Sequence, residues 1–113
     1  MKKVFLTKLF YFSASFSRKS EVHGYNYTLL VRVPFSEKTD ENYIEKKIHD
    51  SIIQKIHSRD LGRDVDFLKK IKITELNLLR IFFKIIQREI KPNKLVELSL
   101  ERGRGTFFSI SRS

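Results

Sequence analysis

The feature that most constrains the fold of this chain is a pair of strand-like segments near its start, residues 3–15 and 25–35. Both are rich in Val, Leu, Phe and Tyr and lack the apolar spacing of a helix, which favours β-strands. The segment SRKSEVHG between them is polar and ends in glycine, as a loop or wide hairpin connection requires. The sequence therefore predicts two strands joined by a loop that ends at His23 and Gly24, with Pro34 near the end of the second strand.

Two helices are predicted in the middle of the chain. Over residues 43–57 isoleucine recurs every four positions among charged residues, which predicts an amphipathic helix with one buried stripe: Ile44, Ile48, Ile52 and Ile56. Thr74 can cap a second helix, which carries a broad apolar face and ends before Pro92. The intervening residues 58–72 carry no sustained period, so they are predicted to form a connection.

Two more strands are predicted towards the end of the chain, at residues 95–102 and 106–111, joined by the turn sequence GRG. In the first of them, Val96, Leu98 and Leu100 alternate with polar residues, which gives the strand one buried and one polar face. The predicted order is strand, strand, helix, helix, strand, strand, an α+β arrangement. A length of 113 residues suits a single domain over residues 1–113 with one core.

Three short sequences resemble one known family. FSASF (residues 12–16) and HGYNY (residues 23–27) resemble the first hairpin of the 6-pyruvoyltetrahydropterin synthase and 6-carboxytetrahydropterin synthase family, which reads roughly F-x-A-x-H and then HGHNY. TELNLL (residues 74–79) is similar to the family's TxENLA. The resemblance covers nearly the whole chain and implies the tunnelling fold, a four-stranded antiparallel sheet with two helices on one face (ββααββ). Family members close their sheets into a barrel, so we expect a homo-oligomer such as a hexamer.

The family hairpin holds a catalytic zinc ion through three histidines. The resemblance places His23 at one of these positions, whereas Phe16 and Tyr25 occupy the other two. A catalytic zinc ion needs about three protein ligands, but phenylalanine has no lone pair to offer and neutral tyrosine is a poor zinc ligand. We therefore expect no zinc cofactor, with His23 as a remnant of the metal site.

The acid–base residues of the family reaction are replaced as well. The chain contains no cysteine, and Lys19 stands at the position of the family's cysteine base. Ser58 stands where the family keeps an acid–base histidine, with His57 one residue early. These replacements predict that the zinc-dependent carbon–oxygen lyase activity is lost. An active enzyme with a relocated set, such as Lys19, Ser58 and Tyr25, remains an alternative.

Glu101 stands at the position of the glutamate with which the family holds its heterocycle, although Arg102 replaces the threonine that follows. A carboxylate can accept two parallel hydrogen bonds from a ring N–H and an exocyclic amino group, which selects pterin-like or purine-like edges. Thr74, kept from the family motif, is the second ligand-binding candidate. The alternative for Glu101 is a surface carboxylate neutralised by Arg102 or Arg104.

The charge is strongly basic, with 23 Lys and Arg against 13 Asp and Glu, a net charge of +10 and a pI of about 10.0. Most of the excess lies in the strand segments, +5 in residues 1–33 and +3 in residues 91–113. This distribution predicts a basic oligomer that attracts nucleic acid or another acidic partner, as an alternative to ring binding. No nucleic-acid-binding motif accompanies it, so a charge that serves solubility alone also stays open.

The first twelve residues, MKKVFLTKLFYF, resemble a signal peptide because lysines precede an apolar run, but Lys8 interrupts that run. We therefore predict a mature strand here and a cytoplasmic protein. No apolar run approaches the roughly 18 residues typical of a membrane span, so no membrane association is expected.

Overall fold

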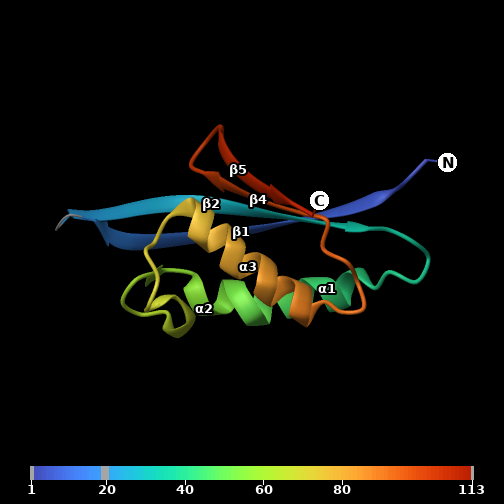
Figure 1. Cartoon of the computed structure of the whole chain (residues 1–113), viewed down its shortest axis with the longest axis horizontal. Helices are drawn as coiled ribbons and strands as arrows, with labels where there is room; N and C mark the ends of the chain where they lie inside the picture. Colours follow the sequence, from blue (N-terminus) through green and yellow to red (C-terminus); the bar gives the residue numbers. More distant parts are fainter. Residues whose placement is uncertain (1, 19–20, 113) are drawn as a thin grey trace.

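Helices pack on one face only of a five-stranded sheet in this computed structural model, which describes residues 2–18 and 21–112 (Figure 1). The sheet order is β3-β1-β2-β4-β5, and all neighbouring strands are antiparallel except β3 and β1. The strands are β1 (Phe5–Arg18), β2 (Glu21–Pro34), β3 (Arg59–Asp60), β4 (Glu97–Arg102) and β5 (Thr106–Ser111). The helical segments are α1 (Glu41–Ile48), a π-helical turn (His49–Ile53), α2 (Gln54–Ile56), a 3-10 helix (Asp66–Leu68) and α3 (Glu75–Glu89).

The first hairpin is longer than predicted. Strands β1 and β2 pair over 14 residues each, from Phe5 opposite Pro34 to the end of the hairpin. The prediction that His23 and Gly24 end a loop was wrong, because both lie inside β2. Side-chain alternation continues through this polar stretch, since His23 pairs with the buried Phe16 across the hairpin.

The prediction of four antiparallel strands was wrong in one detail, the two-residue parallel strand β3. It forms because Ser58 adopts a left-handed backbone conformation, with φ of 60°, which turns the chain back against β1. The N–H of Ser58 then donates to the carbonyl of Ser13 at 2.6 Å, and the N–H of Leu61 donates to that of Ser15 at 2.7 Å. These bonds cover a short part of the otherwise open edge of β1, around Ala14 and Ser15.

Both predicted helices are confirmed. The first begins at Glu41, two residues before the predicted start, because the side chain of Asp40 accepts the Tyr43 N–H at 3.1 Å. It continues through the π-helical turn to Ile56, and all four predicted isoleucines are fully buried. Thr74 caps α3 as expected, since its Oγ1 accepts the Asn77 N–H at 3.2 Å.

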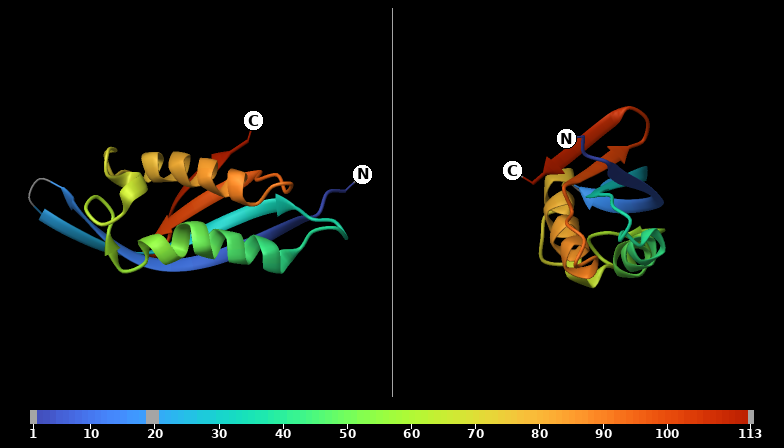
Figure 2. Two further views of the ribbon diagram at one scale, coloured as in Figure 1. Left: turned by 90° about the horizontal axis from the view of Figure 1, so that it is seen from below. Right: turned by 90° about the vertical axis from the view of Figure 1, so that its right-hand side faces the viewer.

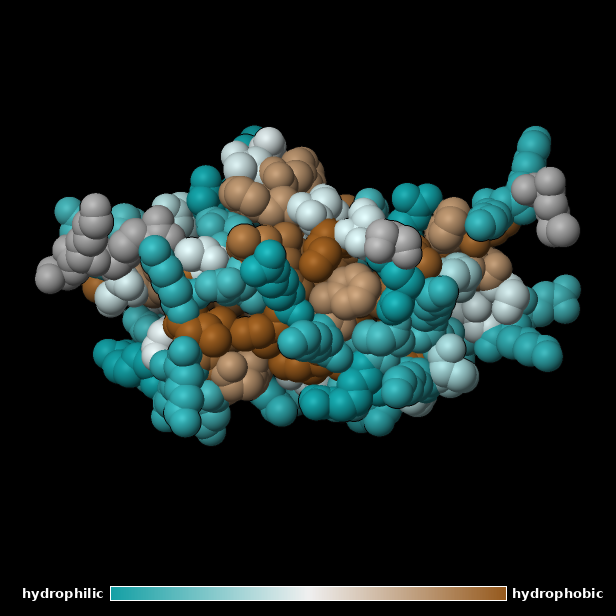
Figure 3. Space-filling view, in the orientation of Figure 1, coloured by the Kyte–Doolittle hydropathy of each residue, from teal (hydrophilic) through white to brown (hydrophobic). Residues whose placement is uncertain are grey.

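The core lies between the sheet and the helical layer, which covers the sheet from one side (Figure 2). Leu98 and Leu100 of β4 are fully buried there, which confirms the predicted alternation. Apolar surface emerges between the charged side chains along α3, where Leu76 is 55% exposed (Figure 3). No helix within the described ranges is long and apolar enough to cross a membrane.

Candidate functional site

The three positions that the resemblance assigns to zinc ligands lie together on the helix-facing side of the first hairpin. The ring centroid of Phe16 lies 5.7 Å from that of His23 and 6.0 Å from that of Tyr25. The rings of His23 and Tyr25 are nearly parallel, with centroids 6.5 Å apart. The sequence therefore predicted correctly which residues meet, and they meet as an aromatic cluster.

The donor chemistry of this aromatic cluster does not fit a three-histidine zinc site. Only His23 offers an imidazole, and the nearest carboxylate oxygen paired with it, from Glu21, lies 3.8 Å from its Nε2. No three His, Cys, Asp or Glu side chains within residues 2–18 and 21–112 gather closely enough to hold a metal ion. At the other two positions the rings of Phe16 and Tyr25 stand in place of imidazoles.

Arg102 closes one side of the aromatic cluster, at the position where the family keeps threonine. Its guanidinium carbon lies 5.4 Å from the ring centroid of Tyr25 and 5.4 Å from that of Phe108. The same guanidinium forms a short hydrogen-bonded ion pair with Glu75, whose side chain is only 12% exposed. The first turn of α3 is thereby fixed to the sheet beside the cluster.

Glu101 lies on the opposite face of the sheet, because side chains alternate along β4 and Arg102 faces the helices. It is opposite Thr28 in the neighbouring strand β2. Its Oε2 accepts the N–H of Gly105 at 3.0 Å, across a turn in which Gly103 and Gly105 have positive φ. Within the described chain Glu101 forms no ion pair with an arginine, and Arg102, one of the two partners named in the alternative interpretation, is paired with Glu75.

Thr74 and Glu101 are not brought together within one chain. Thr74 lies at the start of α3 in the helical layer, and its Oγ1 is occupied by the Asn77 N–H. Its neighbour Glu75 contacts the sheet through Arg102, on the face away from Glu101. A site that used both residues would need the faces of two subunits.

The residues of the relocated catalytic set are only partly brought together. Ser58 and Tyr25 line one hollow of about 390 Å³, beside Ser13. The Ser58 and Ser13 hydroxyl oxygens lie 3.5 Å apart, and His57 Nδ1 accepts the Ser13 N–H at 3.1 Å. His57 thus helps to hold the β3 edge. Lys19 lies outside the described residues.

The sequence did not locate a second site, a groove of about 720 Å³ at the other end of the sheet. It adjoins the start of β1 at Phe5, eleven residues from the aromatic cluster at Phe16, or about 35 Å along the strand. Several side chains of the basic strand segments gather there. The excess of Lys and Arg in those segments indicated a positively charged surface, but it did not indicate where on the molecule that surface lies.

The comparison with solved structures identifies the fold, whereas the two comparisons of sequence find nothing. No protein-family model and no curated protein sequence matches this chain. Sixteen chains of solved structures do match. One is 6-pyruvoyl tetrahydropterin synthase from Caenorhabditis elegans, with a TM-score of 0.84 at 19% identity over 100% of this chain and 98% of that one. Another is the uncharacterised protein WS1659 from Wolinella succinogenes, with a TM-score of 0.76 at 11% identity over 100% of both chains.

The likeness spans the full length of this chain, in which the helices lie on one face of the sheet (Figure 2). The fold expected from the short motifs is confirmed, with β3 as an addition to the four predicted strands. This chain therefore has the tunnelling fold of the 6-pyruvoyltetrahydropterin synthases.

Proposed function

We propose that this chain is a divergent 6-pyruvoyltetrahydropterin synthase-like protein that binds a pterin-like or purine-like ring and has lost the zinc-dependent lyase reaction. The loss of the zinc-dependent reaction is supported by the aromatic cluster, in which the ring of Phe16 packs against those of His23 and Tyr25. Three donor atoms are needed around a catalytic zinc ion, and this cluster supplies one. One such donor is too few to hold a Lewis-acidic ion at these positions.

Ring binding is supported by the environment of Glu101. Each oxygen of an ionised carboxylate has two lone-pair positions, so the bond from Gly105 leaves capacity for a ring N–H and an amino group. A charge-assisted pair of this kind is directional and would select a ring that presents two adjacent donors.

A homo-oligomer is part of the proposal. Among the residues that the structure describes, strand β5 has a hydrogen-bonded neighbour on one side only, and such an edge is a ready template for another strand. Glu101 lies on β4, next to that edge strand. Pairing of β5 with a neighbouring subunit would therefore bring Glu101 close to a subunit interface, where a second chain could complete the wall of a ring site.

Titration with a pterin and with guanine, followed by calorimetry, tests ring binding. Glu101→Gln replaces one acceptor oxygen by a donor that opposes the ring amino group, so we expect at least about a tenfold weaker dissociation constant. Glu45→Gln is the control, since it loses the same charge at an exposed position of α1, away from β4. Equal affinity of the two variants, or no binding by the native chain, would refute the ring site.

The loss of the lyase reaction is tested separately. Metal analysis of the purified protein should find far less than one zinc per chain, and a dihydroneopterin triphosphate-type substrate should not be turned over. Stoichiometric zinc that disappears in His23→Ala would show that the ligands have been misassigned. Turnover that depends on Ser58 and Tyr25 would support the relocated enzyme instead, since these two residues share a hollow.

A further inference from the structure

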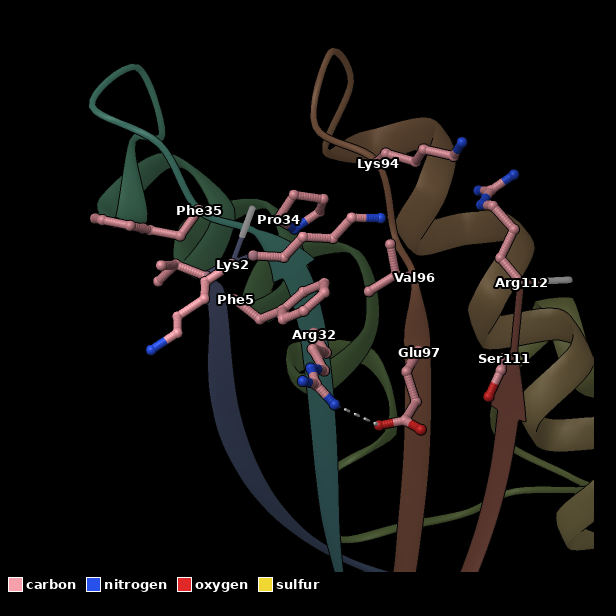
Figure 4. Close-up of a pocket in the computed structure, with 12 residues that line it drawn as sticks. Lys2, Phe5, Arg32, Pro34, Phe35, Lys94, Val96, Glu97, Ser111 and Arg112 are labelled. Carbon is pink, nitrogen blue, oxygen red and sulfur yellow. Dashed lines mark ion pairs between the residues drawn. The ribbon is translucent and has the colours of Figure 1, made fainter.

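The groove at the far end of the sheet is built from segments that are distant in sequence. In Figure 4 side chains reach it from the start of the chain, the end of β2, the segment before β4 and the end of β5. Its charged lining consists of five cationic side chains and one carboxylate: Lys2, Lys3, Arg32, Lys94, Arg112 and Glu97. One carboxylate cannot neutralise five cations, so the groove carries a concentrated positive charge.

The two arginines of the groove are held in place, Arg32 by a long ion pair and a ring contact and Arg112 by neutral acceptors. The guanidinium of Arg32 lies 4.2 Å from the ring centroid of Phe5, while its NH1 lies 3.8 Å from Glu97 Oε1. That distance and the 43% exposure of the Arg32 side chain leave it open to a further anion. Arg112 is oriented by neutral acceptors, since its Nε donates to the carbonyl oxygen of Leu95 at 3.0 Å and its NH2 donates to Gln87.

The three lysines of the groove differ from paired lysines elsewhere. Lys8 forms an ion pair with Glu41 at 2.9 Å, and Lys46 forms one with Asp50 at 3.2 Å. Lys2, Lys3 and Lys94 have no carboxylate within ion-pair distance in the described residues, although all three are exposed. Exposed lysines without such a partner also lie outside the groove, as Lys55, Lys70 and Lys84 do in the described residues. In the groove, however, three of them share one hollow with two arginines, and such a hollow focuses the field that attracts anions.

Apolar side chains lie among these cations. Phe35 is 46% exposed and Val4 is 61% exposed, and both line the groove with Pro34. An exposed aromatic ring beside cations offers a stacking surface for a planar ring next to binding sites for phosphate, the combination found where proteins hold single strands of nucleic acid. A ligand with phosphate alone would make no use of Phe35.

We propose that this groove binds a nucleotide unit, with its phosphates on the lysines and arginines and its base against Phe35. Glu101 takes no part, because it lies four residues along β4 from Glu97, or about 13 Å away. The inference is therefore independent of the ring site proposed above. The unit could be a free nucleotide or part of a single strand, and both sources present the same chemistry to the groove.

The test measures binding of a fluorescein-labelled single-stranded oligonucleotide by anisotropy, with ATP and inorganic phosphate as competitors. The groove variant is Lys2→Gln/Lys3→Gln/Lys94→Gln. Its matched control, with the same loss of charge at exposed positions outside the groove, is Lys55→Gln/Lys70→Gln/Lys84→Gln. At about 50 mM salt we expect the groove variant to bind at least about tenfold more weakly and its salt slope to flatten by about 2, with less than about a threefold change in the control.

The role of the aromatic ring is tested with Phe35→Ala. This variant should lose affinity for the oligonucleotide and for ATP by about threefold or more while competition by inorganic phosphate is unchanged. Strong competition by ATP would identify a free nucleotide as the source, and weak competition by ATP together with tight oligonucleotide binding would identify a strand. Equal weakening in the groove and control variants, or no binding by the native chain at low salt, would overturn the proposal.

Discussion

The contact between Arg102 and Glu75 gives the sharpest quantitative prediction, because it ties α3 to the sheet beside the aromatic cluster. Arg102→Met removes a charge-assisted hydrogen bond worth about 1.5–3 kcal/mol and two cation–ring contacts worth about 0.5–1 kcal/mol each. Methionine regains part of the packing against the rings of Tyr25 and Phe108. We expect a net loss of about 2–4 kcal/mol in the free energy of unfolding.

A double-mutant cycle separates the pair from its surroundings. Urea unfolding at one fixed protein concentration is measured for the native chain, Arg102→Met, Glu75→Gln and the double variant. Arg102→Met leaves Glu75, whose side chain is only 12% exposed, without its guanidinium, and Glu75→Gln leaves the 34% exposed Arg102 without its carboxylate, so the two losses should overlap by about 1–2 kcal/mol. Arg104→Met, in the exposed turn of the same hairpin, is the control and should change stability by less than about 0.5 kcal/mol. Additive losses in the cycle, to within about 0.5 kcal/mol, would refute the reasoning.

Three further changes follow from the same structure. Phe16→His/Tyr25→His should create a zinc site with a dissociation constant on the order of micromolar, measured by chelator competition. The native ring centroids are 5.7–6.5 Å apart, and three imidazoles bound to one zinc ion need centroids about 5 Å apart, so only a small shift is required. No binding at about 100 micromolar zinc would contradict this prediction. Ser51→Ala should raise the free energy of unfolding by about 1 kcal/mol, because the buried Ser51 hydroxyl has no hydrogen-bond partner in the described chain. A urea unfolding midpoint that is unchanged or lower than that of the native chain would contradict this prediction. The hydrogen bond from Arg63 lowers the pKa of Asp64 below the ordinary 3.8, so this pair stabilises the fold above that pH and the contribution is lost as the pH falls through the folded pKa. The difference in stability between the native chain and Asp64→Asn, measured by thermal unfolding, should therefore shrink below about pH 4. A difference that grows below that pH would contradict a stabilising role of the ionised Asp64.

Much of the fold could be predicted because its signals are local. Thr74 caps α3 as expected, and β5 begins and ends at the predicted residues. Strand β3 could not be predicted, since it contains two polar residues and depends on the backbone of Ser58 and on bonds to Ser13 far away in the sequence. The extent of the first hairpin was missed because its tip is polar, although side chains still alternate across it.

The candidate site was predictable only where strand register decides it. Phe16, His23 and Tyr25 meet because residues opposite one another on paired strands share a face. The role of Arg102 was not visible in the sequence, because its partner Glu75 belongs to a different element and its ring contacts come from two strands. The basic groove was missed for the same reason, since four separate segments build it.

The π-helical turn between α1 and α2 explains an unusual property of the isoleucine pattern. An α-helix repeats every 3.6 residues, so a strict spacing of four would rotate each successive side chain by about 40° and carry the last one well away from the first. The wider turn at His49–Ile53, in which the Gln54 N–H donates to the His49 carbonyl, rotates the stripe back in the opposite sense. All four isoleucines can therefore point into the core. In this chain, the strict four-residue spacing of the apolar residues in the sequence therefore indicates that the helix backbone is locally underwound.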